Sequence, residues 1–107
     1  MNDPTFVEAS RKLAERVLAW SEKRQEERLA LMFRLVTGRW PVVAEQRQLR
    51  ETLEYLLADF QRDVPAAQQL MGIGESPYDK TLDVAELAAY TAIANALLQI
   101  DETITRN

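Results

Sequence analysis

The chain contains no cysteine and no histidine. Without cysteine it can form neither disulfides nor thiolate metal sites, and cysteine usage gives no information on its redox compartment. Without histidine it lacks the commonest metal ligand and the commonest general base, and it cannot hold a histidine-ligated haem. Zinc, iron–sulfur and triad chemistry are therefore excluded within this chain. We expect no catalytic residue, metal ligand or cofactor-binding residue in it.

Long apolar runs and a basic patch are also missing. No apolar run approaches the roughly 20 residues that a membrane span needs, and no segment resembles a signal peptide. The net charge is −4, and it is unevenly distributed, since residues 63–107 hold 2 basic and 7 acidic side chains. The 11 basic side chains of residues 1–62 are interleaved with 10 acidic ones, which leaves no basic stripe for phosphate contacts. We therefore predict neither a membrane span nor nucleic-acid binding.

What is present is typical of one folded helical domain. The 107 residues, 47% of them hydrophobic and 28% charged, suffice for a modest core and exclude a disordered chain. Apolar residues recur at helical spacing, and no segment shows the alternation expected of a strand. The sequence predicts an all-α fold over residues 1–107, a compact bundle of four longer helices and one short helix. The expected helical ranges are 4–20, 25–37, 43–61, 63–71 and 84 onward.

The last of these helices is apolar on nearly all sides. Asp83 is its expected N-cap, Glu86 can complete a capping-box-like pair, and apolar residues follow almost without a break to Ile100. Water would penalise such a helix on any exposed face, so it must lie in the middle of the bundle. In the first helix, by contrast, an apolar stripe that includes Trp20 faces a polar side that carries Arg11 and Glu15. We expect Trp20 and Tyr90 in the core and Arg11 on the polar surface.

The turn after the second helix holds the best candidate for a docking residue. Gly38 suits a left-handed C-cap, and Pro41 prevents the helix from continuing. Trp40 lies in this turn beside Arg39, and both residue types are enriched at interface hot spots. Two interpretations stay open: Trp40 is exposed for docking, or it folds back over the junction between the two helices.

A polar loop of about ten residues precedes the last helix and offers a second candidate. Gly72, Gly74, Glu75 and Ser76 resemble an anion cradle, but the spacing of the known phosphate-binding motifs is absent. The simpler interpretation is that Gly72 caps a helix and Gly74 supplies a positive φ. Glu75 is either a carbohydrate ligand or general acid, or a solvated loop acid. A hard-cation site that combines Glu75 with Asp79 and Asp83 does not match the calcium-loop pattern.

Five segments in matching order resemble a known family. They are Asn2-Asp3-Pro4-Thr5-Phe6-Val7-Glu8-Ala9, Gly38-Arg39-x-Pro41, Gly74-Glu75-Ser76, Glu86-Leu87-Ala88-Ala89-Tyr90-Thr91 and Leu97-Leu98-x-x-Asp101-Glu102. Together they are similar to the C-terminal end of a planctomycete domain of unknown function, and the similarity covers essentially the whole chain. Val42-Val43 is a departure, because the family more often has a polar, helix-starting residue there.

The resemblance implies that the chain is a C-terminal fragment of a large, exported, cytochrome-c-associated protein, periplasmic or at the cell surface. Any haem would belong to another domain, and no activity is transferred to residues. Our first hypothesis is a non-catalytic structural or interaction domain with partners among the other domains of the parent protein, which as a fragment could also form a homodimer. The candidate interaction residues are Arg39, Trp40, Gly74, Glu75 and Ser76. The alternative is an accessory domain of a hydrolytic enzyme, with the loop from Gly74 to Asp83 binding carbohydrate.

Overall fold

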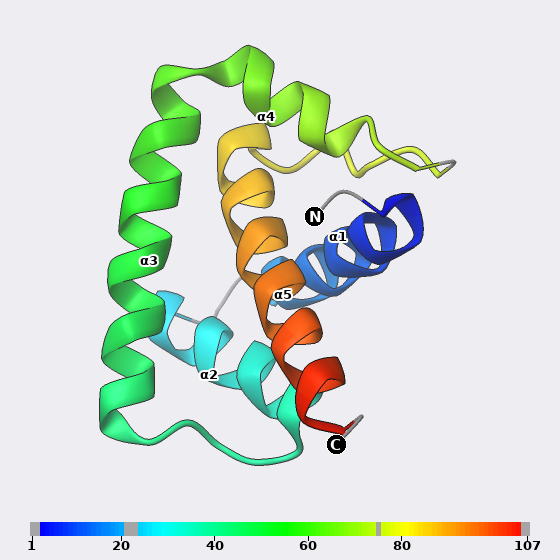
Figure 1. Cartoon of the computed structure of the whole chain (residues 1–107). Helices are drawn as coiled ribbons and strands as arrows, with labels where there is room; N and C mark the ends of the chain where they lie inside the picture. Colours follow the sequence, from blue (N-terminus) through cyan, green and yellow to red (C-terminus); the bar gives the residue numbers. More distant parts are fainter. Residues whose placement is uncertain (1–2, 21–23, 75, 106–107) are drawn as a thin grey trace.

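Five α-helices account for most of the computed structural model, which describes residues 3–20, 24–74 and 76–105, with side chains as far as Asp101 (Figure 1). They are α1 (Pro4–Leu18), α2 (Gln25–Thr37), α3 (Val43–Arg62), α4 (Val64–Met71) and α5 (Val84–Thr105). No strand occurs in the described segments. The predicted all-α fold class is confirmed, and the predicted helical ranges agree with the observed helices to within about two residues, although α1 ends before Trp20.

Short acidic side chains begin three of the helices. Asp3 caps α1 by accepting a hydrogen bond from the Thr5 amide at 2.9 Å, and Pro4 occupies the first turn, where no amide donor is needed. Asp63 accepts from the Ala66 amide at 3.1 Å, and Asp83 accepts from the Glu86 amide at 2.9 Å. These bonds satisfy backbone donors that the helix itself leaves unpaired.

Helix α3 begins without a capping side chain, because Val42 has no oxygen to accept a hydrogen bond. Glu45, in the first turn, compensates in part. Its Oε1 atom accepts a hydrogen bond from the Val42 amide at 3.0 Å, which is one half of a capping box. The predicted start of this helix at Val43 is confirmed despite the missing cap.

Two glycines adopt the left-handed backbone conformation that the sequence predicts for them. Gly38 ends α2 with φ +83°, and Gly74 lies in the loop before α5 with φ +100°. A Cβ atom on Gly74 would also lie 2.6 Å from Oε1 and 3.2 Å from Cβ of Glu8, so a larger residue there would require the Glu8 side chain to move. Gly72 is the C-cap of α4 as predicted, with an ordinary right-handed φ of −81°.

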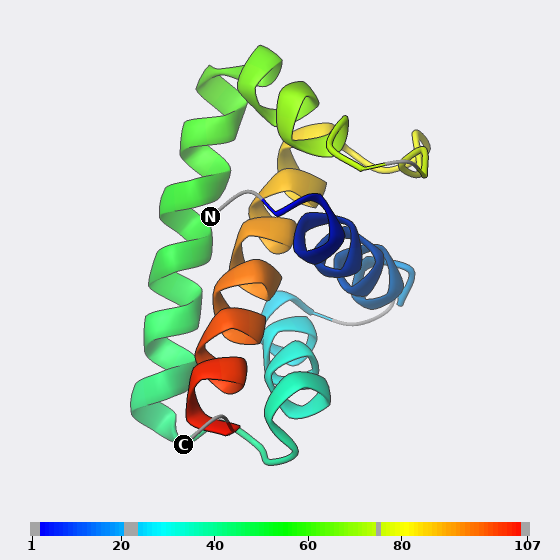
Figure 2. The same ribbon diagram turned by 45° about the vertical axis from the view of Figure 1, so that its right-hand side comes forward.

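The core forms around the first half of α5. Helix α5 packs against α1, α2, α3 and α4, most extensively against α1 (Figures 1 and 2). On four successive residues, from Leu87 to Tyr90, its side chains are at most 2% exposed, which explains why the sequence is apolar on nearly every side here. Val17 of α1, Met32 of α2 and Leu53 of α3 meet it in one continuous cluster. The prediction that Tyr90 is a core residue is confirmed, and burial raises the pKa of its hydroxyl, with Arg28 opposing the shift.

The prediction for Trp20 is wrong. Helix α1 ends at Leu18, and Ala19 is its C-cap, so the apolar stripe of the helix stops before Trp20. The indole is 45% exposed as a result. Glu22, on the expected polar side of the first helix, lies outside the described residues.

The prediction for Arg11 is also wrong, since its side chain is completely buried between α1 and the loop that follows α4. Its Nη1 atom donates to the carbonyls of Met71 and Ile73 at 3.3 and 3.1 Å. Its Nη2 atom donates to the Ser76 carbonyl at 2.9 Å, and Glu15 lies 3.9 Å from Nε. The guanidinium thus supplies donors to three backbone acceptors that no helix satisfies. Arg11 thus ties the loop to α1 through three hydrogen bonds.

Candidate interaction cleft

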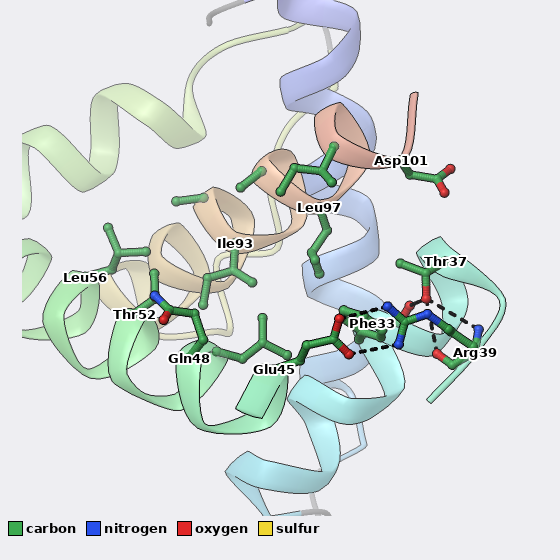
Figure 3. A pocket seen from close by; sticks show the side chains of 14 residues that line it. Phe33, Thr37, Arg39, Glu45, Gln48, Thr52, Leu56, Ile93, Leu97 and Asp101 are labelled. Carbon is green, nitrogen blue, oxygen red and sulfur yellow. Dashed lines mark hydrogen bonds and ion pairs between the residues drawn. The ribbon is translucent and has the colours of Figure 1, made fainter. Parts of the chain in front are cut away.

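An apolar cleft of about 660 Å³ lies between α2, α3 and residues 92–101 of α5 (Figure 3). Helices α3 and α5 run side by side in opposite directions, and they form its two long walls (Figures 1 and 2). Phe33 and Thr37, near the end of α2, contribute the third side of the cleft. A volume of this size is within the range of small-molecule and peptide-binding sites, roughly 300–1,000 Å³.

The floor of the cleft is continuous with the core. Phe33 of α2, Leu49 of α3, and Ile93 and Leu97 of α5 line it, each less than 10% exposed. Ile100 stands farther out on the same stripe of α5 and is 57% exposed. Covering apolar surface lowers the free energy by roughly 25 cal/mol for each Å² that is removed from water. A partner that covers the cleft would therefore bury apolar surface, most of all at Ile100.

Polar side chains surround this floor. Glu45 of α3 and Arg39 of the α2–α3 turn form a two-armed ion pair, with both nitrogen–oxygen distances at 2.8 Å (Figure 3). Arg39 also lies over the Phe33 ring, with its guanidinium carbon 5.0 Å from the ring centroid. Gln48, Thr52 and Asp101 complete the polar border. An apolar centre with a polar border is the usual anatomy of a protein-binding surface.

The ion pair fixes the charge state of Glu45. The hydrogen bonds from Arg39 and, to a smaller extent, from the Val42 amide lower the pKa of Glu45 from 4.5 to about 2. The interaction with Glu45 raises the pKa of Arg39 in turn. Because the pKa of Glu45 is lower in the folded state, its stabilising contribution is fully present above pH 4.5 and is lost as the pH falls through about 2. Both charges are therefore present at the cleft border throughout the neutral and mildly acidic range.

Replacing Arg39 with alanine is expected to raise the pKa of Glu45 from about 2 toward 4.5. The value should stay below 4.5, because the Val42 amide still donates to the carboxylate. A titration of the side-chain carboxyl carbon by NMR measures this directly. Arg47→Ala is the matched control, an exposed arginine on α3 that should leave the Glu45 titration unchanged. A parent protein whose Glu45 titrates near 4.5 would show that the ion pair does not form in solution.

The turn that holds Trp40 borders the same end of the cleft. Trp40 is 57% exposed, and the Arg34 guanidinium carbon lies 5.7 Å from the centroid of its indole ring. Val42 and Val43 follow it and are 58% and 77% exposed. Of the two interpretations left open, the exposed one is therefore the observed one, and Arg39 and Trp40 are both available at the surface. Their role in docking stays a prediction.

Two of the other predicted interaction residues, Gly74 and Ser76, lie away from the cleft. Gly74 and Ser76 belong to the loop between α4 and α5, at the opposite end of the molecule from the α2–α3 turn (Figures 1 and 2). The Ser76 hydroxyl donates to Glu8 of α1, and the Asp79 amide donates to Glu15 at 2.7 Å. The loop thus uses these polar groups to attach itself to α1. Glu75 lies outside the described residues.

The acids of the unfavoured hard-cation site that can be placed, Asp79 and Asp83, are engaged locally. Asp79 accepts hydrogen bonds from the amide and hydroxyl of Thr81, which lower its pKa, and Asp83 caps α5. Within the described segments, which omit Glu75, no group of three or more acidic side chains is arranged to hold a metal ion. None of the helices described has a stretch long and apolar enough to cross a membrane.

Sequence reasoning found the residues at one end of the cleft but not the cleft itself. Arg39 and Trp40 were singled out from residue type and turn position alone. Leu49, Leu56 and Ile93 read as ordinary core positions, because local periodicity cannot show that the space between two helices stays open. The sequence shows only that the apolar run of α5 continues to Ile100, and its exposure there becomes visible in the structure.

Comparison with known proteins adds no further constraint. A scan against protein-family models, a search of curated proteins and a search of solved structures each found no match for this chain.

Proposed function

We propose that this chain is a non-catalytic interaction domain of a larger exported protein, which uses the cleft between α3 and α5 to pack on another domain, a second protein or a second copy of itself. The apolar lining of the cleft is the observation that carries the proposal, because Ile100 is exposed there beside floor residues that belong to the core. Trp40 and Arg39 at its end are of the types enriched in binding hot spots.

The five segments that resemble the planctomycete domain support the wider setting of this proposal. They suggest a parent protein that is exported and associated with cytochrome c, in the periplasm or at the cell surface. Any haem would then be held by another domain, since this chain has no histidine or cysteine to attach it. We also propose that the bundle of four longer helices and one short helix, with α5 at its centre, serves as a scaffold that positions the cleft.

Site-specific photo-crosslinking of the full-length protein in its own cells tests the interaction function. The photoreactive residue p-benzoylphenylalanine replaces Ile100 inside the cleft or, as the control, Val64 on α4, which is 39% exposed and apolar. We expect a discrete crosslinked product from position 100 only, with the partner peptide identified by mass spectrometry. Equal crosslinking from both positions, or none from position 100, would refute the interaction function of this cleft.

The alternative, an accessory domain of a hydrolytic enzyme, has one observation in its favour. A hollow of about 490 Å³ lies beside Gly74, and Glu8 and Lys12 of α1 contribute polar groups to it. Neither Tyr90, which is buried, nor Trp40, which belongs to the α2–α3 turn, lines this hollow as an aromatic platform. Binding to a glycan array that is lost in Glu75→Gln would support this function, and absence of glycan binding would contradict it.

A further inference from the structure

We infer that the occupant of the cleft is an amphipathic α-helix of about three turns, with one apolar stripe and lysine or arginine residues beside it. This inference rests on the proposed interaction function and names the partner chemistry of the same site. Three properties of the cleft support the inference: its length, the residues of its walls and its charge.

The length of the cleft matches a short helix. Its wall on α3 runs from Glu45 to Leu56, and its wall on α5 runs from Ala92 to Asp101. At 1.5 Å per residue these segments extend about 16 Å and about 14 Å, the length of roughly three helical turns. Helices α3 and α5 run side by side (Figure 2), and the cleft is lined along both of them, so its long direction follows the two helices, the geometry in which a third helix packs. A volume of about 660 Å³ fits the side chains of one helical stripe.

The walls allow a helix to approach closely. Ala92 and Ala96 are one turn apart on the α5 wall, so at these two positions the wall has only a methyl group facing an incoming helix. Leu56 and Ile100 stand near the two ends of the groove, where they can contact the first and last apolar residues of a bound stripe. On the α3 wall the polar side chains of Gln48 and Thr52 form one edge. This arrangement corresponds to helix-in-groove recognition, with anchors at spacings of three and four residues.

The charge of the lining selects the polar flanks of the partner. One cation, Arg39, and two carboxylates, Glu45 and Asp101, border the cleft, which gives the lining a charge of −1. The whole chain carries −4, so its long-range field also attracts a basic partner. Basic residues beside the apolar stripe complement this border, whereas acidic residues in the same positions would be repelled.

Titration of the full chain with a fluorescently labelled synthetic peptide tests the inference. The probe is a 15-residue helical peptide with leucines at spacings of three and four residues and lysines beside them, measured by fluorescence anisotropy. We expect saturable binding that weakens at least tenfold when the leucine positions are scrambled and at least fivefold when glutamate replaces lysine. Amide NMR shifts should change at Thr52, Ala92 and Ala96.

A pair of matched variants separates cleft binding from general attraction between opposite charges. Ala96→Phe fills the groove from an exposed position, and Ala58→Phe places the same bulk on an exposed position of α3 on the side of that helix away from the cleft. Binding should fall at least tenfold in Ala96→Phe and stay within twofold of the parent in Ala58→Phe. Equal binding by the two variants, or no saturable binding by the parent, would overturn the helical partner. Crosslinking from position 100 without peptide binding would overturn only this inference, and a crosslinked peptide from the same chain would assign the cleft to a second copy.

Discussion

Replacing Arg11 with alanine is expected to lower the free energy of unfolding by about 3–5 kcal/mol. Arg11 is completely buried and donates to the carbonyls of Met71, Ile73 and Ser76. An unpaired buried acceptor costs about 1–3 kcal/mol, and water can reach only the more exposed of these carbonyls once the side chain is gone. Loss of the apolar part of the side chain adds a cavity between α1 and the loop.

Urea denaturation of purified variants measures this loss. The control is Arg16→Ala, an exposed arginine on the same helix, for which we expect a change within about 0.5 kcal/mol. Arg11→Lys should fall between the two, because an ammonium keeps the charge but cannot reproduce the fixed fork of the guanidinium. In hydrogen exchange, the amides of residues 76–82 should lose protection first. A midpoint for Arg11→Ala equal to that of Arg16→Ala would show that the loop holds its place without the guanidinium.

Two leucines of α5 should respond differently to truncation. Leu87 is completely buried in the first half of the helix, and Leu87→Ala is expected to cost about 3–5 kcal/mol because it leaves a sealed cavity. Leu97 is 8% exposed and lines the open cleft, so Leu97→Ala should cost only about 2 kcal/mol, the low end of the range for such changes. In the second case the freed space joins the cleft, where water can enter.

The comparison is made at constant temperature from denaturation midpoints with unchanged slopes. Leu35→Ala is the control, since Leu35 is 43% exposed on α2 and should change stability by no more than about 0.5 kcal/mol. Equal losses for Leu87→Ala and Leu97→Ala would mean that the cleft is closed in solution. That result would also remove the basis of the proposed interaction function.

Helix boundaries were predictable because short-range chemistry sets them. Asp3, Asp63 and Asp83 accept hydrogen bonds from amides two or three residues ahead, and Gly38 ends α2 in the left-handed conformation, so the signals and their effects lie close together in sequence. The burial of the first half of α5 followed from its composition alone. These features required no knowledge of which helix packs on which.

The features that sequence reasoning missed depend on distant segments. Arg11 reads as a surface residue because its three acceptors lie 60 to 65 residues away in a loop whose path no local pattern gives. The cleft arises from three helices together, and no single one of them shows it. Trp20 was misplaced for a local reason, because helical spacing continues past the residue at which α1 ends.

Because α5 contacts every other helix and follows all of them in the sequence, it decides when folding can finish. A nascent chain that has emerged only as far as α4 would have four helices that contact one another but lack the helix against which each of them packs in the folded protein. The packing of α1 against α5 brings together segments that are about 80 residues apart in the sequence. Contacts between such distant segments lower the folding rate. Synthesis on the ribosome should therefore yield a loosely collapsed intermediate that becomes protease-resistant only once residues beyond Leu97 have cleared the exit tunnel.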